Sequence, residues 1–217
     1  NNVSSCKDIT KTIVATCDQE IKNYIESISG ESIMTSNMHE RASDRCAEAL
    51  SILEKKDGTN YDIVVMVQGD EPMTSAEMIS QAISPMINDS NINVVNLVGE
   101  IKDELEFNDR NCIKVVCDLN DNALFFSREP IPTLANTSLI QMKKQVCVIP
   151  FRREFLFKYT SLKPTPLEKI ESVDMMRFVE NGYKVKMVEC KDEVKSVDCQ
   201  ADLEEAEKIL KKNLNKD

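Results

Sequence analysis

The sequence predicts an α/β domain with a mostly parallel sheet. Apolar runs of strand length alternate with amphipathic stretches of helix length almost from end to end, a pattern typical of parallel strands connected by helices. The run IVVMV at residues 63–67 is apolar throughout rather than alternating, as expected for a strand covered on both faces. With 217 residues, 41% of them hydrophobic, the chain can build one sizeable core, so we expect a single domain over residues 1–217.

Local signals place the individual elements. Ser75 can cap a helix, and Glu77 and Met78 follow it in the first turn. The turn-rich tetrapeptide LNDN at residues 119–122 separates two apolar runs and predicts a hairpin inserted into the fold. Residues 133–144 are polar and small with weak periodicity, which predicts a loop. Strands are expected at 12–16, 32–35, 62–68, 92–98, 112–118, 123–127, 146–151 and 184–188, and helices at 19–28, 40–55, 75–87, 153–161, 166–180 and 201–214.

The charge balance narrows the classes of partner. Asp and Glu total 37 against 27 Lys and Arg, and the formal net charge is −10. This argues against a sequence-independent nucleic-acid binder, which would carry a basic stripe. An anionic small substrate stays open, because a metal ion and a few local cations can neutralise a phosphate chain.

The termini and the cysteines indicate a cytoplasmic protein. No apolar run reaches the roughly 18 residues of a membrane span, and the start NNVSSCKDIT lacks the apolar region of a secretory signal. The eight cysteines form no C-x-x-C pair and only one histidine, His39, is present, so a structural zinc site has little support. We expect buried free thiols in a reducing cytoplasm.

The strongest candidate site is the segment VMVQGDEP at residues 65–72. A buried strand ends here in acidic side chains, at the sheet edge where open α/β folds bind their ligands. Asp70 at this edge can bind Mg²⁺ and through it a substrate phosphate; the alternative is a turn with solvated acids. Asp198, after the last expected strand, is a second candidate for the metal or, equally, a helix cap.

Three further segments carry polar side chains that could contact substrate. In HERASDR, residues 39–45, small residues with accessible main-chain groups suit recognition of a base, and Arg45 is either a ligand or a structural anchor. Arg128 follows a strand and can bind a carboxylate bidentately, unless it pairs with Glu129. Glu171 and Asp174 lie three residues apart on one face of the helix expected at 166–180, and could hold sugar hydroxyls or form a solvated acidic face.

Together these segments resemble the 3-deoxy-manno-octulosonate cytidylyltransferases, or CMP-KDO synthetases. The similar segments run in order along the chain: IVATCDQEI, MT with HERASDR, VQGDEP, FN with IKVVCD, ALFFSREPIP, PFRREFL, TPLEKIE and SVDCQADLE. The resemblance implies a Rossmann-like nucleotidyltransferase fold of the nucleotide-diphospho-sugar transferase type, with a mixed, mostly parallel sheet. It also implies a homodimer that transfers CMP from CTP to a 3-deoxy-2-keto sugar acid with Mg²⁺, releasing pyrophosphate for surface-polysaccharide or lipopolysaccharide precursors.

The resemblance assigns roles by position. Asp70 and Asp198 match the metal ligands, and Arg128 matches the arginine near the sugar acid; these three are the candidate catalytic residues. The positions assigned to the nucleotide are Ala42, Ser43, Arg45 and Gln68, and those assigned to the sugar are Arg128, Gln145, Glu171 and Asp174.

Departures from the family pattern leave the acceptor open. The family's first βα unit, with its Arg- and Lys-bearing phosphate loop, would occupy roughly 30–40 residues before Asn1, so we expect this chain to be a slow enzyme. Gln145, Ile149 and Met175 replace a His, a Tyr and a Gln on the sugar side. The acceptor is therefore KDO, a related or amino-substituted acid, or a sialic-acid-like nonulosonate. A non-catalytic homologue without a phosphate loop is the alternative from another class.

Overall fold

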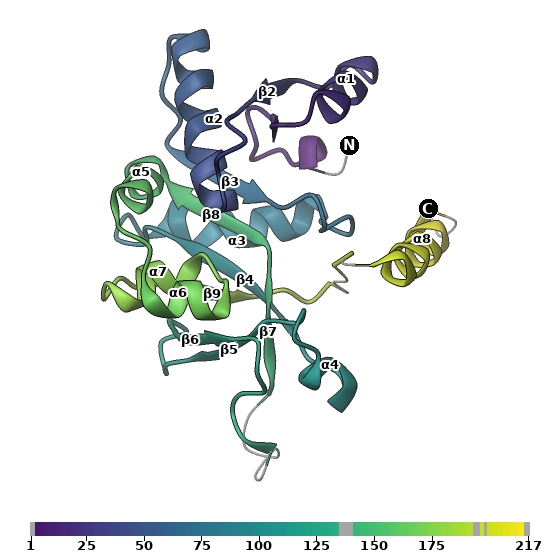
Figure 1. Cartoon of the computed structure of the whole chain (residues 1–217), viewed down its shortest axis with the longest axis vertical. Helices are drawn as coiled ribbons and strands as arrows, with labels where there is room; N and C mark the ends of the chain where they lie inside the picture. Colours follow the sequence, from purple (N-terminus) through teal and green to yellow (C-terminus); the bar gives the residue numbers. More distant parts are fainter. Residues whose placement is uncertain (1–2, 135–140, 193–195, 198, 215–217) are drawn as a thin grey trace.

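Strands that are far apart in the sequence build the centre of the molecule (Figure 1). The computed structural model describes residues 3–134, 141–192, 196–197 and 199–214. Strand β1 (Val14–Thr16) pairs in parallel with β2 (Ser32–Met34), and β3 (Ile63–Val67) pairs antiparallel with β8 (Val148–Arg152). A five-stranded sheet has the order β6-β5-β7-β4-β9. Its strands are β4 (Val95–Glu100), β5 (Lys114–Cys117), β6 (Ala123–Ser127), β7 (Lys143–Val146) and β9 (Lys186–Glu189).

The directions of the strands bring three carboxyl ends to one edge. Cys147 alone separates β7, which pairs with β4, from β8, which pairs with β3. A bridge between Val94 and Phe151 and a 2.8 Å bond from the Arg152 amide to the Asn93 carbonyl continue the antiparallel contact between β8 and the β4 strand. Since β3 and β4 both run antiparallel to β8, and β9 is parallel to β4, strands β3, β4 and β9 all end at the same edge, where α/β folds bind ligands.

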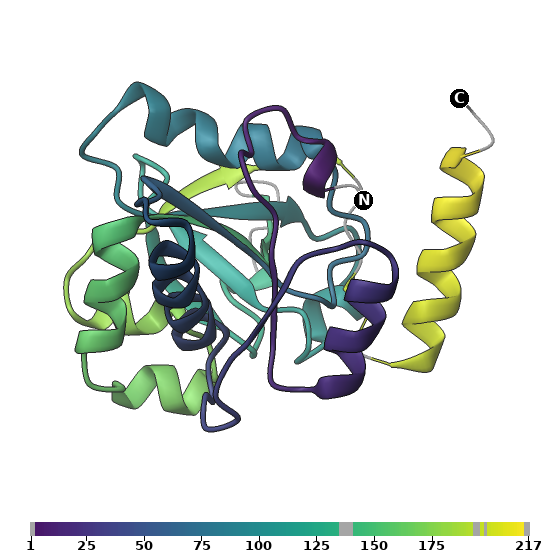
Figure 2. The same ribbon diagram turned by 90° about the horizontal axis from the view of Figure 1, so that it is seen from above.

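Helices cover both faces of these strands (Figure 2). The Met78 and Ile79 side chains of α3 pack with Leu97 of β4 on one face, while Leu50 of α2 and Phe178 of α7 pack with the strands on the other. Neighbouring residues of β4 thus point to opposite cores, as the pleat requires. The helices are α1 (Gln19–Ser27), α2 (Ala42–Asp57), α3 (Ala76–Asn88), α4 (Glu104–Asn108), α5 (Arg153–Ser161), α6 (Pro166–Glu171), α7 (Met175–Glu180) and α8 (Gln200–Leu214), with a 3₁₀ turn η1 at Val3–Ser5.

The mixed α/β class is confirmed, as are the hairpin and the cap of α3. Strands β5 and β6 pair antiparallel, and the Asp118 carboxylate accepts the main-chain N–H groups of Asn120 and Asn122, each at 2.8 Å, which forms the tight turn. The Ser75 hydroxyl accepts the Met78 amide at 3.1 Å. Antiparallel pairs are more frequent than the sequence pattern indicates, because β7 and β8 run against their neighbours.

Two predicted elements are corrected. The single helix expected at 166–180 is two helices, because Ser172 adopts the left-handed conformation (φ 55°, ψ 47°) that ends α6. The loop expected at 133–144 is wrong at its end, where strand β7 begins at Lys143; the two lysines at the start of β7 hid the strand pattern. Residues 135–140 of that predicted loop lie outside the described residues. Both lysines are held by acids, Lys143 by Glu189 at 2.7 Å and Lys144 by Glu106.

None of the helices in the described part of the chain has the length and apolar character that a membrane span requires. All eight cysteines are free. Cys6 and Cys190 are buried as expected, whereas Cys17 and Cys199 are exposed.

Candidate active site at the carboxyl edge of the strands

Asp70 stands at the carboxyl end of β3 with one oxygen buried. Its Oδ1 atom has no hydrogen-bond partner among the described residues, whereas its main-chain carbonyl accepts the Val197 amide at 2.8 Å. A buried carboxylate oxygen without a donor costs free energy, because the hydration lost on folding is not replaced. A cation would supply the missing partner, so Asp70 fits the metal ligand predicted at this position.

The segment that leads to Asp198 returns to the same place. Besides the Val197 bond, the Ser196 hydroxyl donates to Glu71 Oε1 at 3.0 Å. Asp198 itself lies outside the described residues. No group of three or more His, Cys, Asp or Glu side chains forms a metal cluster in the part of the chain that the structure describes.

Glu71 is a structural residue that the sequence patterns did not single out. Its side chain is buried and its Oε1 atom also accepts the Cys147 amide at 3.0 Å. Burial raises the pKa of Glu71, against the hydrogen bonds from Cys147 and Ser196. Cys147 joins β7 to β8, and its carbonyl accepts the Gln68 amide at 3.2 Å. Glu71 therefore attaches the loop that contains Asp70 to the junction between these two strands.

The start of α2 brings a predicted nucleotide residue against a predicted sugar residue. Asp174 Oδ2 accepts the Ser43 amide at 3.1 Å and the Ser43 hydroxyl at 2.7 Å. The N-cap residue of α2, Arg41, makes no side-chain cap bond, so a carboxylate 131 residues away in sequence satisfies this helix end. Burial raises the pKa of Asp174, although the two bonds from Ser43 act in the opposite direction.

Replacing Asp174 by Ala is therefore expected to destabilise the fold by about 1–2 kcal/mol, the cost of losing a good helix cap. Urea unfolding of the variant beside Asp62→Ala, which removes an exposed carboxylate before β3, measures the difference. Equal unfolding midpoints for the two variants would contradict the capping role.

Arg128 ends the hairpin with its guanidinium bound to main-chain oxygens. Its Nε donates to the Glu171 carbonyl at 2.7 Å, its Nη1 to the Arg110 carbonyl at 2.9 Å and its Nη2 to the Ser172 carbonyl at 3.4 Å. The alternative partner, Glu129, instead pairs with Arg110 at 2.5 Å. These neutral acceptors orient Arg128 without neutralising its charge, and of the five N–H donors of a guanidinium three are used by these contacts.

The two acids predicted to hold sugar hydroxyls face different partners. Glu171 Oε2 accepts the Arg128 amide at 2.8 Å, while Asp174 contacts Ser43. They were expected on one helix face, but the break at Ser172 separates them. Two arginines nevertheless contact Ser172: Arg41 Nη1 donates to its hydroxyl at 2.8 Å, and Arg128 Nη2 donates to its carbonyl.

The remaining predicted residues are bound within the protein. Arg45 donates to the Thr35 hydroxyl at 2.6 Å and to the Ser36 carbonyl at 3.2 Å, in agreement with a structural anchor. Gln145 on β7 donates to the buried Asn96 side chain at 2.6 Å. Ala42 is the first residue of α2. His39 lies 2.5 Å from Glu48.

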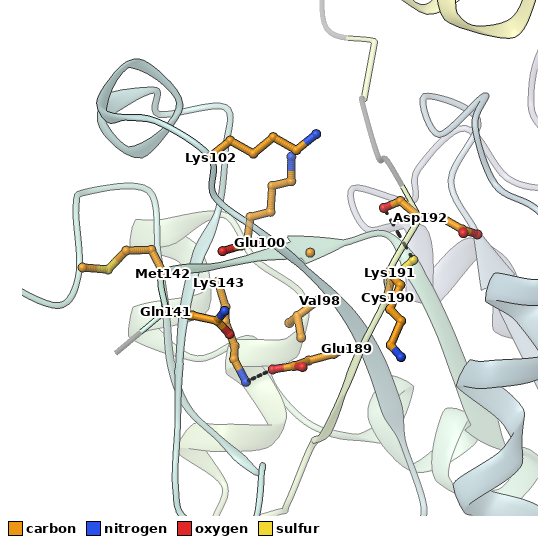
Figure 3. Close-up of a pocket in the computed structure, with 12 residues that line it drawn as sticks. Val98, Glu100, Lys102, Gln141, Met142, Lys143, Glu189, Cys190, Lys191 and Asp192 are labelled. Atoms are coloured by element: carbon orange, nitrogen blue, oxygen red, sulfur yellow. Dashed lines mark hydrogen bonds and ion pairs between the residues drawn. The ribbon is translucent and has the colours of Figure 1, made fainter. Parts of the chain in front are cut away.

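A cavity of about 340 Å³ opens at the same edge, beyond the ends of β4 and β9 (Figure 3). The Lys143–Glu189 ion pair lies on its wall. On the rim, Asp192 accepts the Ser75 hydroxyl at 2.8 Å, which links the cavity to the loop after Asp70. Lysines 102, 143, 144 and 191 and the acids Glu100, Glu189 and Asp192 line it. In the sequence, isolated Lys and Glu residues at strand ends have the pattern of ordinary solvent-exposed residues. The sequence therefore did not predict this cavity.

Comparisons with known proteins agree with the geometry. The model of the cytidylyltransferase family matches residues 1–193. The 3-deoxy-manno-octulosonate cytidylyltransferase of Fusobacterium nucleatum subsp. nucleatum is 35% identical over 95% of this chain and 82% of its own length. The enzyme of that name from Geotalea uraniireducens is 37% identical over 94% of this chain and 83% of its own length.

Solved structures agree as well. A CMP:2-keto-3-deoxy-manno-octonic acid synthetase complexed with CTP superposes with a TM-score of 0.85 and 27% identity, over 98% of this chain and 85% of that chain. A 4-diphosphocytidyl-2C-methyl-D-erythritol synthase from Anaerococcus prevotii shares the fold alone, with a TM-score of 0.60 at 18% identity over 97% of this chain and 85% of that chain. The chain therefore belongs to the cytidylyltransferase family, in the group of the 3-deoxy-manno-octulosonate cytidylyltransferases, as its motifs indicate.

Proposed function

We propose that this protein transfers CMP from CTP to the anomeric hydroxyl of KDO or a closely related sugar acid and releases pyrophosphate. The observation that carries the proposal is the buried Oδ1 atom of Asp70 at the carboxyl edge of β3, which has no hydrogen-bond partner in the described part of the chain. This is the place where a nucleotidyltransferase needs a cation beside the triphosphate. Family membership and the likeness to a CTP-bound synthetase support the reaction class.

Mg²⁺ is the cofactor that fits the chemistry of this edge. Mg²⁺ is usually held by one or two carboxylates together with substrate phosphates, and Asp70 with Asp198 would supply the two carboxylates. The chemistry supplied by the bound ion is neutralisation of charge on the triphosphate and on the departing pyrophosphate.

The side chains of the chain bind and orient the two substrates. The α2 start, held by Asp174 through Ser43, presents main-chain groups at a fixed position for the cytidine. The Arg128 guanidinium, which donates to three main-chain carbonyls, would bind the sugar carboxylate through its charge. With the acceptor so oriented, the anomeric oxygen forms a bond to the α-phosphorus, the bond from that phosphorus to the pyrophosphate oxygen breaks, and the hydroxyl proton passes to solvent. Positioning of this kind supplies much of the rate enhancement.

Two further parts of the proposal concern the surroundings of the enzyme. We expect a homodimer, and Leu119 and Leu124 on the β5–β6 hairpin are exposed apolar side chains available to a second copy. Light scattering after gel filtration measures the mass.

Eight free cysteines and the use of CTP support a cytoplasmic location.

The test is transfer of label from radiolabelled CTP to a sugar acid, with MgCl₂ and the protein in excess over CTP. Excess protein makes a single turnover visible even where the reaction is slow. The panel is KDO, its 8-amino analogue and sialic acid. Labelled CMP-KDO, absent without Mg²⁺, is the expected product.

The other outcomes are equally informative. Product with sialic acid alone would replace KDO by a nonulosonate acceptor. No product with any acid, from a folded protein that binds CTP, would overturn the transferase and leave a nucleotide-binding homologue.

A further inference from the structure

Lys114, at the start of β5, is a buried charge that the proposed reaction does not use. Its side chain is fully buried. The Nζ atom donates to the main-chain carbonyls of Asp109 at 2.7 Å, Cys112 at 2.7 Å and Arg128 at 2.6 Å. A lysine ammonium has three donors, and all three have a carbonyl acceptor here. The arrangement is that of a charged ammonium, although burial lowers the pKa of Lys114.

Hairpin pairing alone does not require a cation at this position. Lys114 lies opposite Ser127 in the β5–β6 register, and an apolar side chain of similar size would fill the same volume. Removing an ammonium from water is unfavourable even after the protein relaxes around it. The three carbonyls offset that cost because the backbone holds all of them within hydrogen-bond distance of the Lys114 Nζ atom.

Those three carbonyls belong to the two segments that orient Arg128. One is the carbonyl of Arg128 itself. The other two, from Asp109 and Cys112, lie on either side of Arg110, whose own carbonyl accepts Arg128 Nη1 at 2.9 Å. Lys114 therefore fixes the main chain of Arg128 and the loop that supplies one acceptor of its guanidinium.

We propose that Lys114 is a positioning residue that sets the place and direction of the Arg128 guanidinium for the sugar carboxylate. The role rests on the proposed function, in which Arg128 binds that carboxylate. Lys114 does not touch substrate in this account; it acts by holding the 109–112 loop and the end of β6 together.

The first test is Lys114→Met. The KM for KDO is expected to rise about tenfold or more, since small displacements of a binding group are costly, while the affinity for CTP by calorimetry stays within about twofold. The matched control is Lys186→Met on β9, because Lys186 also donates to a carbonyl of this hairpin, that of Asn120 at 2.8 Å, but at its tip. The control is expected to leave both constants unchanged.

A second readout does not depend on catalysis. The Arg128 Nε–H donates to the Glu171 carbonyl at 2.7 Å and should exchange slowly in ¹⁵N NMR, its signal assigned by its loss in Arg128→Lys. In Lys114→Met this signal is expected to shift and to exchange faster. In Lys186→Met it should stay unchanged.

Coupling between the residues separates positioning from stability. If Lys114 acts through Arg128, Lys114→Met adds little to the KM for KDO in an Arg128→Lys background. Additive losses, or an unchanged KM together with an unchanged Nε–H signal, would overturn the proposal. Lys114→Gln, which keeps two N–H donors, takes the place of the Met variant if the latter does not fold, and the NMR test still decides if wild type proves inactive with KDO.

Discussion

Asp70→Asn is expected to lower the rate of CMP transfer by more than about a hundredfold. Loss of a residue that only supports a metal ligand typically costs 10–100-fold, so loss of a ligand costs more. The fold should not suffer, because the Asp70 carbonyl, not its side chain, bonds to Val197. The unpartnered Oδ1 atom becomes part of a neutral amide, so the melting temperature without Mg²⁺ should stay equal or rise.

Metal binding gives this prediction a readout besides activity. In wild type with CTP, added MgCl₂ is expected to raise the melting temperature by mass action, and Asp70→Asn should lose most of that rise. Asp62→Asn is the matched control, since Asp62 is an exposed acid just before the amino end of the same strand. An Asp70→Asn enzyme with wild-type turnover and wild-type Mg²⁺ stabilisation would refute the metal site.

The sequence predicted the parts of the site that local patterns encode. A buried run followed by Gln68, Gly69 and Asp70 fixes a strand and its acidic end within eight residues, and the hairpin follows from the turn after Asp118. These features depend on neighbours in the chain, so a single sequence carries them. The same holds for the Ser75 cap of α3.

Contacts between distant segments had no such signal. Ser43 and Asp174 were assigned to different substrates, and their bond became visible only when α2 and α7 were placed together. The helix break at Ser172 was missed because serine is not a usual left-handed residue; contacts from Arg41 and Arg128 surround it. In the sequence, Lys114 is one polar residue within an apolar run, and its three acceptors come from two separate segments.

Arg177→Met is expected to lower the free energy of unfolding at pH 7 by about 3–5 kcal/mol, the usual cost of breaking a buried ion pair. Arg177 Nε and Nη2 donate to the two oxygens of Glu168 at 2.7 and 2.6 Å, and both side chains are buried. The guanidinium also lies 4.0 Å from the ring centroid of Tyr159. Removing it leaves the Glu168 carboxylate in the core with the more distant Arg41, at 3.3 Å, as the nearest cation. Urea unfolding measures the loss.

The destabilisation caused by Arg177→Met should become smaller at low pH. Burial alone would raise the pKa of Glu168, but bonds from Arg177 and the Thr165 amide outweigh it and hold the pKa below the ordinary 4.5. A lowered pKa in the fold gives stability that is present above 4.5 and disappears as the pH falls through the folded value. In the variant, the buried Glu168 carboxylate has lost Arg177, so its protonation in acid removes an uncompensated buried charge. The difference between wild type and variant should therefore decrease below about pH 4.5.

A double variant distinguishes the pair from its separate parts. Glu168→Met combined with Arg177→Met removes both charges, and an apolar pair of similar volume is often as stable as a buried ion pair. The double variant should therefore be more stable than Arg177→Met alone, a coupling that independent residues would not show. Arg110→Met, which breaks the exposed pair with Glu129, should cost at most about 1 kcal/mol. Strictly additive losses in the double variant would mean that Glu168 and Arg177 stabilise the fold through separate contacts.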